Sequence, residues 1–464
     1  MSHTLFVDAV GTTIRVDLAG LDEQSRSAVR RVWRDAAAAR PAHARAAATV
    51  VATASVSREV VLADLSQRVT LAALEAARGT AWMLHAAGVA THDGRVAVLV
   101  GPSGRGKTTA ALNLGRALGY VSDEAVAIGA DGGVRPYRKP LSIIDRIDAP
   151  KTQTAPSDLG LRALPQAPLS LGAIVLLDRR DDAPEEPLVE IVDLGDALPE
   201  LIAQTSHLAD LPAPLQTVAA HVASVGGVRR VRYRDAADLA GVVEALLGSA
   251  RVQNIPAVSR SAPPGTALPA EDAPHDEERW FRAPAIDVLA LEDPERLAVL
   301  RGAAGSRHEG GATVHLLAGI APALWRAAAD GVSADGLVAA AVAAYGDPGM
   351  GAEATGLVEA AVEELAAAGL LVRRARRWRI RGDVAWTGGR DRVAVLTLGV
   401  ADESPLALEG SAALIWLALA ERPVDMRTLV ERVARSAGAE PDVVRADVTA
   451  FVAELLHGGL VAPG

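Results

Sequence analysis

A glycine-rich stretch of the chain has the residue types and spacing that bind a nucleoside triphosphate. It reads Gly101, Pro102, Ser103, Gly104, Arg105, Gly106, Lys107, Thr108 and Thr109. Glycines let backbone N–H groups close on phosphate oxygens, the lysine reaches the β- and γ-phosphates, and the next hydroxyl ligates Mg²⁺. The sequence therefore predicts an ATP site made by Gly101, Ser103, Gly104, Arg105, Gly106, Lys107, Thr108 and Thr109. The alternative is a glycine-rich turn that binds no ligand.

The segments on either side are those that a phosphate-binding loop requires. Val96–Val100 is a short apolar run that predicts a buried strand, and Thr108–Leu118 predicts the helix whose N-terminus faces the phosphates. Only three of the 47 basic residues are lysines, namely Lys107, Lys139 and Lys151. Because this chain uses arginine almost everywhere, a lysine inside the loop favours the functional interpretation.

Two acids follow the predicted helix, and a histidine precedes the loop. Asp123 and Glu124 come at the end of an apolar strand, where one acid can hold a metal and the other can accept a hydroxyl proton. The alternative is a solvated pair at a strand end. His85 lies 16 residues before Gly101, and taken alone it is more often explained as a hydrogen-bonded histidine of the core.

Together these residues resemble the catalytic domain of HPr serine kinase/phosphorylase and the wider HPr-kinase-like group. The matching segments are residues 84–89, 93–95, 101–109, 118–124 and 135–142. The resemblance implies a P-loop α/β fold related to phosphoenolpyruvate carboxykinase. It also implies that Asp123 is the base assisted by His85, and that Glu124 and Thr108 lie near the magnesium.

The chain departs from this family in two ways. The second acid of the pair is Glu124, where the family usually has Asp, and the later glycine-rich signature of true HPr kinases is not recognisable. The departures point away from HPr as the substrate and leave transfer to another hydroxyl open. Relatives that phosphorylate lasso peptides show that the family is not bound to HPr.

The order of apolar runs predicts an α/β domain over residues 1–249, followed by a linker at 250–282 rich in Pro and acidic residues. Strands are expected at 5–9, 13–18, 49–52, 60–63, 96–100 and 171–177. Helices are expected at 26–39, 65–77, 108–118 and 236–247.

Residues 283–389 and 390–464 contain two copies of one pattern. Trp325 and Trp416 are 91 residues apart, and Gly369 and Gly459 are 90 residues apart. Each copy predicts strands followed by three helices, the last of which ends at its glycine. We therefore expect two small winged helix-turn-helix α+β domains that arose by duplication.

The second copy resembles PqqD, the peptide-recognition element in the biosynthesis of ribosomally synthesised and post-translationally modified peptides (RiPPs), and the first copy is similar. The resemblance is carried by residues 395–398, 407–416, 424–430 and 443–460. It implies that a precursor's leader peptide binds as an added strand, near 313–317 or 405–409.

Charge argues against DNA binding, which is the other common use of a winged helix. Residues 283–389 hold 10 Arg against 13 acidic residues, and residues 390–464 hold 7 against 11. DNA readers need a basic face. The local exception is an arginine-rich run from Arg373 to Arg381 in which Trp378 and Ile380 alternate with arginines, as on a two-faced strand. It is either a solvated face or a surface that binds an acidic leader.

Composition narrows the class of protein further. The net charge of −10 argues against general nucleic-acid and membrane partners, and the absence of cysteine excludes disulfides and thiolate zinc sites and fits a cytoplasmic protein. We expect neither a signal peptide nor a membrane-spanning helix. The sequence thus supports a RiPP protein that binds ATP, Mg²⁺ and a precursor peptide and phosphorylates a Ser or Thr. Two alternatives stay open: a non-catalytic scaffold that presents the peptide to partner enzymes, and an ATP-sensing winged-helix regulator.

Overall fold

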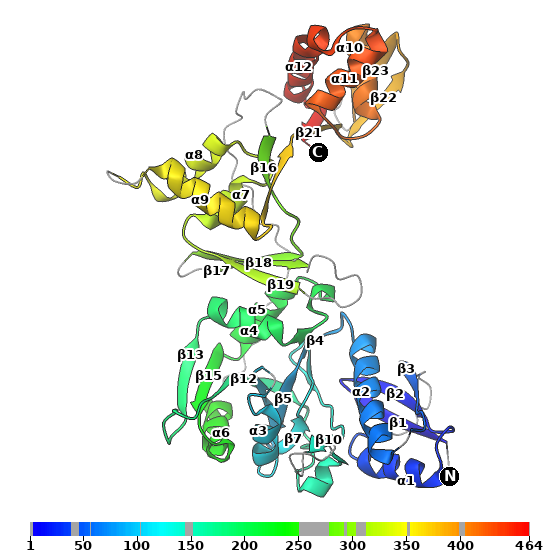
Figure 1. Cartoon of the computed structure of the whole chain (residues 1–464), viewed down its shortest axis with the longest axis vertical. Helices are drawn as coiled ribbons and strands as arrows, with labels where there is room; N and C mark the ends of the chain where they lie inside the picture. Colours follow the sequence, from blue (N-terminus) through cyan, green and yellow to red (C-terminus); the bar gives the residue numbers. More distant parts are fainter. Residues whose placement is uncertain are drawn as a thin grey trace. The chain divides into compact units, whose positions relative to one another are not determined.

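The computed structural model describes residues 3–38, 46–55, 57–102, 104–143, 152–249, 278–291, 295–302, 312–349, 353–398 and 404–463 (Figure 1). The chain divides into two compact units. Unit 1 contains residues 1–262 and 285–317, and unit 2 contains residues 263–284 and 318–464. The three strands of the first repeated copy thus belong to unit 1, whereas its helices belong to unit 2. Both units mix helices and strands.

Unit 1 begins with a small sheet covered by two helices. Its strands pair in the order β1-β2-β3, and α1 and α2 share one apolar core with them (Figure 1). These elements are β1 (Thr4–Ala9), β2 (Thr12–Asp17), α1 (Glu23–Val32), β3 (Ala48–Val51) and α2 (Arg58–Ala76). The prediction of a strand at 60–63 is wrong, because these residues lie in the first turns of α2. Ser57 caps that helix by accepting a hydrogen bond from the Val60 N–H at 3.3 Å, and the burial of Val61 and Leu62 outweighs the β-propensity of the two valines.

A six-stranded sheet forms the centre of unit 1. Its order is β13-β15-β12-β6-β5-β7, with β12 parallel to both β15 and β6, and with β5 antiparallel to β6 and β7. The strands are β5 (Ala86–Ala90), β6 (Arg95–Val100), β7 (Gly119–Ser122), β12 (Ser170–Arg179), β13 (Leu188–Val192) and β15 (Val228–Tyr233).

Side chains alternate between the two faces of this sheet, as the period of a strand requires. On β6, Ala97 and Leu99 face α3 and α6, whereas Val96, Val98 and Val100 face α4, α5 and a second sheet of order β14-β4-β8-β9. These elements are α3 (Lys107–Leu114), α4 (Leu194–Ala203), α5 (Pro214–Ser224), α6 (Leu239–Ser249), β4 (Ala81–Leu84), β8 (Val126–Gly129), β9 (Val134–Arg135) and β14 (Thr205–Ser206). A further hairpin pairs β10 (Leu141–Ile143) with β11 (Thr152–Thr154).

A three-stranded sheet, β17 (Asp287–Leu291), β18 (Arg296–Gly302) and β19 (Ala312–Leu317), packs on α4 and α5 (Figure 1). Polar contacts hold it there. The buried Asp287 carboxylate accepts a hydrogen bond from the Leu215 N–H at 2.8 Å and so caps α5. The Arg296 guanidinium binds Asp196 at 2.8 Å and also binds Asp193, the residue that caps α4. The sheet is therefore fixed to the start of both helices.

Unit 2 contains two helical sets. In the first, α7 (Ala321–Ala327), α8 (Ala334–Tyr345) and α9 (Ala354–Ala367) pack together, and β16 (Glu278–Arg282) pairs with β20 (Leu371–Ala375). In the second, which we call the C-terminal module (377–463), β22-β23-β24 and β25-β21-β26 pack with α10, α11 and α12. Its elements are β21 (Arg377–Ile380), β22 (Val384–Gly388), β23 (Arg392–Thr397), β24 (Leu406–Glu409), α10 (Ser411–Ala420), β25 (Val424–Asp425), α11 (Met426–Ala437), α12 (Pro441–His457) and β26 (Val461–Pro463).

The anchors of the repeated pattern have matching local structure. Trp325 and Trp416 are both fully buried. Gly369 and Gly459 follow α9 and α12 with φ of +69° and +67°, so the prediction that each last helix ends at its glycine is confirmed. Within the ranges that the structure describes, no helix is long and apolar enough to span a membrane.

The cap that Asp287 provides for α5 yields a stability prediction. Replacing Asp287 with Ala leaves the first N–H groups of α5 without an acceptor, so we expect the free energy of unfolding to fall by about 1–2 kcal/mol. Urea denaturation measures this loss, with Glu186→Ala, which removes an exposed acid of the same unit, as the control. Equal stability of the two variants would contradict the cap.

The buried His221 yields a pH prediction. Its ring stacks on Trp82 with 5.8 Å between the ring centroids, and only 1% of the residue is exposed. Its Nδ1 has no hydrogen-bond partner among the described residues, and burial lowers its pKa to about 4. In the unfolded chain His221 binds a proton near pH 6.5, whereas in the folded chain it does so only near pH 4. The free energy of unfolding is therefore highest above about pH 6.5 and falls as the pH drops towards 4. At pH 5 the loss is about 2 kcal/mol.

Replacing His221 with Phe should remove this acid sensitivity. Stability at pH 7 should change little, while at pH 5 the variant should unfold at higher urea than the wild type. The control is His92→Phe, because His92 is exposed. Parallel pH profiles for the wild type and His221→Phe would show that this histidine is not the group responsible.

Candidate functional site

The glycine-rich loop connects the end of β6 to the start of α3, which is the strand–loop–helix order expected from the sequence. Gly104 and Gly106 have φ of +80° and +88°, a region that other residues rarely adopt. A Cβ on Gly106 would also lie 3.2 Å from the Tyr233 hydroxyl. Two of the predicted glycines are thus required by backbone conformation. Ser103 lies outside the described residues.

Lys107 points back into the loop. Its Nζ donates to the carbonyl oxygens of Gly101 at 2.5 Å and Pro102 at 3.3 Å, and the residue is buried. Burial lowers the pKa of Lys107, and the nearby Glu124 carboxylate acts in the opposite direction. The Lys107 ammonium therefore contacts uncharged carbonyl groups, and an anion bound in the loop would stabilise its positive charge.

The acid pair follows β7 and lies beside the loop. The Thr108 hydroxyl lies 3.4 Å from Asp123 Oδ2, and the Tyr120 hydroxyl donates to Asp123 Oδ1 at 3.0 Å. Asp123 is buried, whereas Glu124 is partly exposed. The structure thus brings together Lys107, Thr108 and the two acids. Of the other predicted loop residues, Arg105 and Thr109 are exposed.

His85 joins this group through strand pairing. It precedes β5, whose first residue Ala86 pairs with Val100, the residue before the loop. The backbone N–H of His85 donates to the Gln204 carbonyl oxygen at 2.7 Å. The residue is exposed at this end of the sheet, but partial shielding of its ring from water lowers its pKa, the Lys107 charge lowers the pKa further, and the Glu124 charge acts in the opposite direction. His85 is therefore biased towards the neutral imidazole that a proton acceptor needs.

Lys139 is a site residue that the sequence interpretation did not include. Its Nζ lies 2.7 Å from Glu124 Oε2 and 3.9 Å from Asp123 Oδ1, and its side chain is only 4% exposed. The signal that could have found it is the scarcity of lysine, since Lys107 and Lys139 are two of the three lysines in the chain. No group of three or more His, Asp or Glu side chains that could hold a metal occurs in the described ranges.

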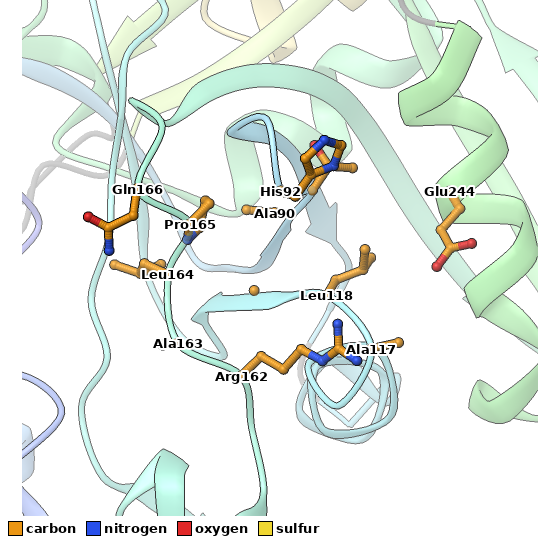
Figure 2. A pocket seen from close by; sticks show the side chains of 12 residues that line it. Ala90, His92, Ala117, Leu118, Arg162, Ala163, Leu164, Pro165, Gln166 and Glu244 are labelled. Carbon is orange, nitrogen blue, oxygen red and sulfur yellow. The ribbon is translucent and has the colours of Figure 1, made fainter.

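A separate cavity of about 650 Å³ lies at the opposite end of the sheet, where β5 ends and β7 begins (Figure 2). Leu118, Leu164 and Pro165 give it an apolar lining, and Arg162 and Glu244 come from different segments at its rim (Figure 2). No motif or pattern in the sequence had indicated this cavity. It does not include any of the predicted catalytic or phosphate-binding residues.

The C-terminal module presents a strand edge and exposed apolar side chains. In the sheet β22-β23-β24, β24 is an edge strand, and 49% of Leu406 on β24 and 72% of Val443 on α12 are exposed. An edge strand with an exposed apolar side chain such as Leu406 is what an added peptide strand needs.

The arginine-rich run has the two-faced form expected from the sequence. On β21, Trp378 is buried, whereas Arg377 and Arg379 are exposed. Some of the other arginines in the run already form ion pairs or lie against an aromatic ring. Arg373 pairs with Glu278 at 3.0 Å, Arg381 pairs with Asp383 at 2.6 Å, and the Arg376 guanidinium lies 4.4 Å from the Trp378 ring centroid. Binding of an acidic leader to this run stays a hypothesis.

Comparison with known proteins gives one family match, and it falls on this module. Residues 399–461 match the family model of coenzyme PQQ synthesis protein D, PqqD. Among solved structures, the chain is similar to the HPr(Ser) kinase/phosphatase of Coxiella burnetii, with 14% identity, a TM-score of 0.21, and coverage of 36% of this chain and 93% of that one. No curated protein matches the chain.

Proposed function

We propose that this protein acts in the biosynthesis of a RiPP. Its C-terminal module binds the leader of a precursor peptide, and its P-loop unit binds ATP with Mg²⁺ and phosphorylates a Ser or Thr of that peptide. The observation that carries the proposal is the PqqD match at residues 399–461, on a module that has β24 at the edge of its sheet.

Leader binding follows from the chemistry of that edge. An extended peptide pairs its backbone with β24, while its apolar side chains cover exposed groups such as Leu406 and Val443. The hydrogen bonds of the added strand are independent of sequence, so specificity comes from the side chains that fit beside α12.

The residues beside the P-loop fit a magnesium nucleotide. In the described part of the chain the Lys107 ammonium donates to uncharged carbonyl oxygens, and Mg²⁺ prefers oxygen ligands such as the Thr108 hydroxyl. Glu124 adds a partly exposed carboxylate. Bound ATP supplies the γ-phosphoryl group, and the metal neutralises the charge of the phosphates.

In the proposed reaction, the peptide hydroxyl oxygen forms the new bond to the γ-phosphorus, the bond to ADP breaks, and the hydroxyl proton passes to Asp123. Tyr120 and Lys139 hold the Oδ1 side of that carboxylate, so Oδ2 is the oxygen that faces Thr108 and the loop. Lys107 stabilises the negative charge on the phosphoryl group, and His85 assists Asp123.

A non-catalytic scaffold is the second candidate, because both acids are already engaged within the chain. Lys139 binds Glu124, and Tyr120 binds Asp123. In that case the module presents the peptide to other RiPP enzymes and the nucleotide serves only to stabilise unit 1.

Transfer of label from ATP tests the kinase function. With labelled ATP and a precursor peptide encoded beside the gene, we expect label on the peptide, reduced at least about 100-fold in Asp123→Asn and in Lys107→Met. The matched control is Asp131→Asn, which changes an exposed acid of the same unit. Nucleotide binding without labelled peptide would support the scaffold, and no nucleotide binding would refute the ATP half of the proposal.

Peptide binding tests the recognition function. In this proposal the leader covers Leu406 and Val443, and a carboxylate at either position would be desolvated, so Leu406→Glu and Val443→Glu should each weaken leader binding at least about tenfold in fluorescence anisotropy. Leu357→Glu, which alters an exposed leucine of α9, is the control and should bind normally. Unchanged affinity in both test variants would place the leader elsewhere.

A further inference from the structure

Lys139 has an environment that its position in the sequence does not explain. It lies in the segment between β9 and β10, and its side chain is buried although lysine usually reaches solvent. Its ammonium donates to the Pro140 carbonyl at 3.1 Å and pairs with Glu124 at 2.7 Å. Asp123 Oδ1 lies 3.9 Å away. This lysine is therefore a cation close to both members of the acid pair.

The two residues before Lys139 are held in place by their own contacts. Arg138 donates to the carbonyls of Tyr120 at 2.6 Å and Arg162 at 2.8 Å, and its guanidinium lies 5.5 Å from the Tyr120 ring centroid. The Tyr137 hydroxyl makes a buried 2.9 Å hydrogen bond with Thr70. With both neighbours anchored, the main chain at Lys139 has little freedom to move away from the acids.

The Lys139 ammonium offsets part of the negative charge of Asp123 and Glu124. Two adjacent carboxylates repel each other and also repel the phosphates of a nucleotide, while they attract any divalent cation. The Lys139 ammonium forms an ion pair with Glu124 and lies 3.9 Å from Asp123 Oδ1. One of the two negative charges is thus compensated within the chain before any ligand binds.

We propose that Lys139 is a positioning residue that makes the acid pair take up its divalent cation together with a nucleotide and not alone. The ammonium lowers the attraction of Asp123 and Glu124 for a free cation and lowers their repulsion of triphosphate. This inference rests on the proposed binding of ATP with Mg²⁺. It gives Lys139 a role in ligand binding beyond its contact with the Oδ1 side of Asp123 in the proposed transfer step.

Binding measurements on the full chain test it without any assay of activity. Calorimetric titrations use MnCl₂ alone, and ATP alone in the presence of EDTA, on the wild type, Lys139→Met and Lys139→Arg. In Lys139→Met we expect Mn²⁺ to bind about tenfold more tightly and metal-free ATP about tenfold more weakly, the effect of one charge a few ångströms away in a partly solvated site. Lys139→Arg keeps the charge and should stay close to the wild type.

Opposite shifts for the metal and the nucleotide are the decisive result, because simple damage to the site would weaken both. Arg116→Met, which removes an exposed cation just after α3, is the control and should shift neither. If Lys139→Met does not fold, as judged by circular dichroism, Lys139→Gln is measured in its place with the same expected shifts. Affinities that fall together, or that do not change, overturn the inference.

The two proposals fail in different ways. A wild-type chain that binds no ATP, with or without metal, contradicts the proposed function, while the Mn²⁺ titrations still decide whether Lys139 lowers the affinity of the acid pair for a cation. A wild-type chain that binds ATP while Lys139→Met behaves identically contradicts only the role of Lys139.

Discussion

The pairing of β5 with both β6 and β7 is the constraint on which the candidate site depends. β5 runs antiparallel to both strands, so its first residue lies beside the last residues of its neighbours. Ala86 pairs with Val100, and Gly88 pairs with Ser122, which brings His85, the loop and Asp123 to one edge of the sheet. A slip of one residue would turn every side chain of β5 to the opposite face and separate these groups. Gly88 permits the close pairing, because a Cβ there would lie 3.2 Å from Val121 and Val126.

Much of this edge could be predicted from local sequence. The strand before the loop, the helix after it and the acids at the next strand end were all expected, because each depends on residues close together in the chain. The strand expected at 60–63 failed because two adjacent valines favour a strand locally, while the Ser57 cap and the core beneath α2 favour a helix. Lys139 was missed as a site residue for a different reason. Its place beside Asp123 depends on the long-range anchoring of Arg138 to Tyr120 and Arg162, and no short motif encodes that anchoring.

The packing of β17–β19 on α4 and α5 was also not predicted from the sequence. Asp287 reads as a polar residue at the start of an apolar strand, yet its carboxylate caps a helix that begins more than 70 residues earlier in the chain. Arg296 reads as one of many surface arginines, but only 13% of its side chain is exposed because it binds two acids at the start of α4. Polar residues that bind the ends of distant helices follow no periodicity, so the sequence could predict these strands but not the surface that they cover.

The two copies share buried tryptophans and glycines that end their last helices, but their sheets differ in how much of their surface is covered. β18 contains the run Leu297, Ala298, Val299 and Leu300, and all four residues are buried, so both faces of this strand are covered. β23 alternates instead, with Val393 and Val395 buried and Ala394 partly exposed, and Trp386 on the neighbouring β22 is 41% exposed. The sheet of the C-terminal module therefore keeps solvent-accessible surface, whereas the first sheet is a structural layer of unit 1. This difference, already present in the apolar pattern of the two strands, supports placing the proposed peptide binding on the second copy.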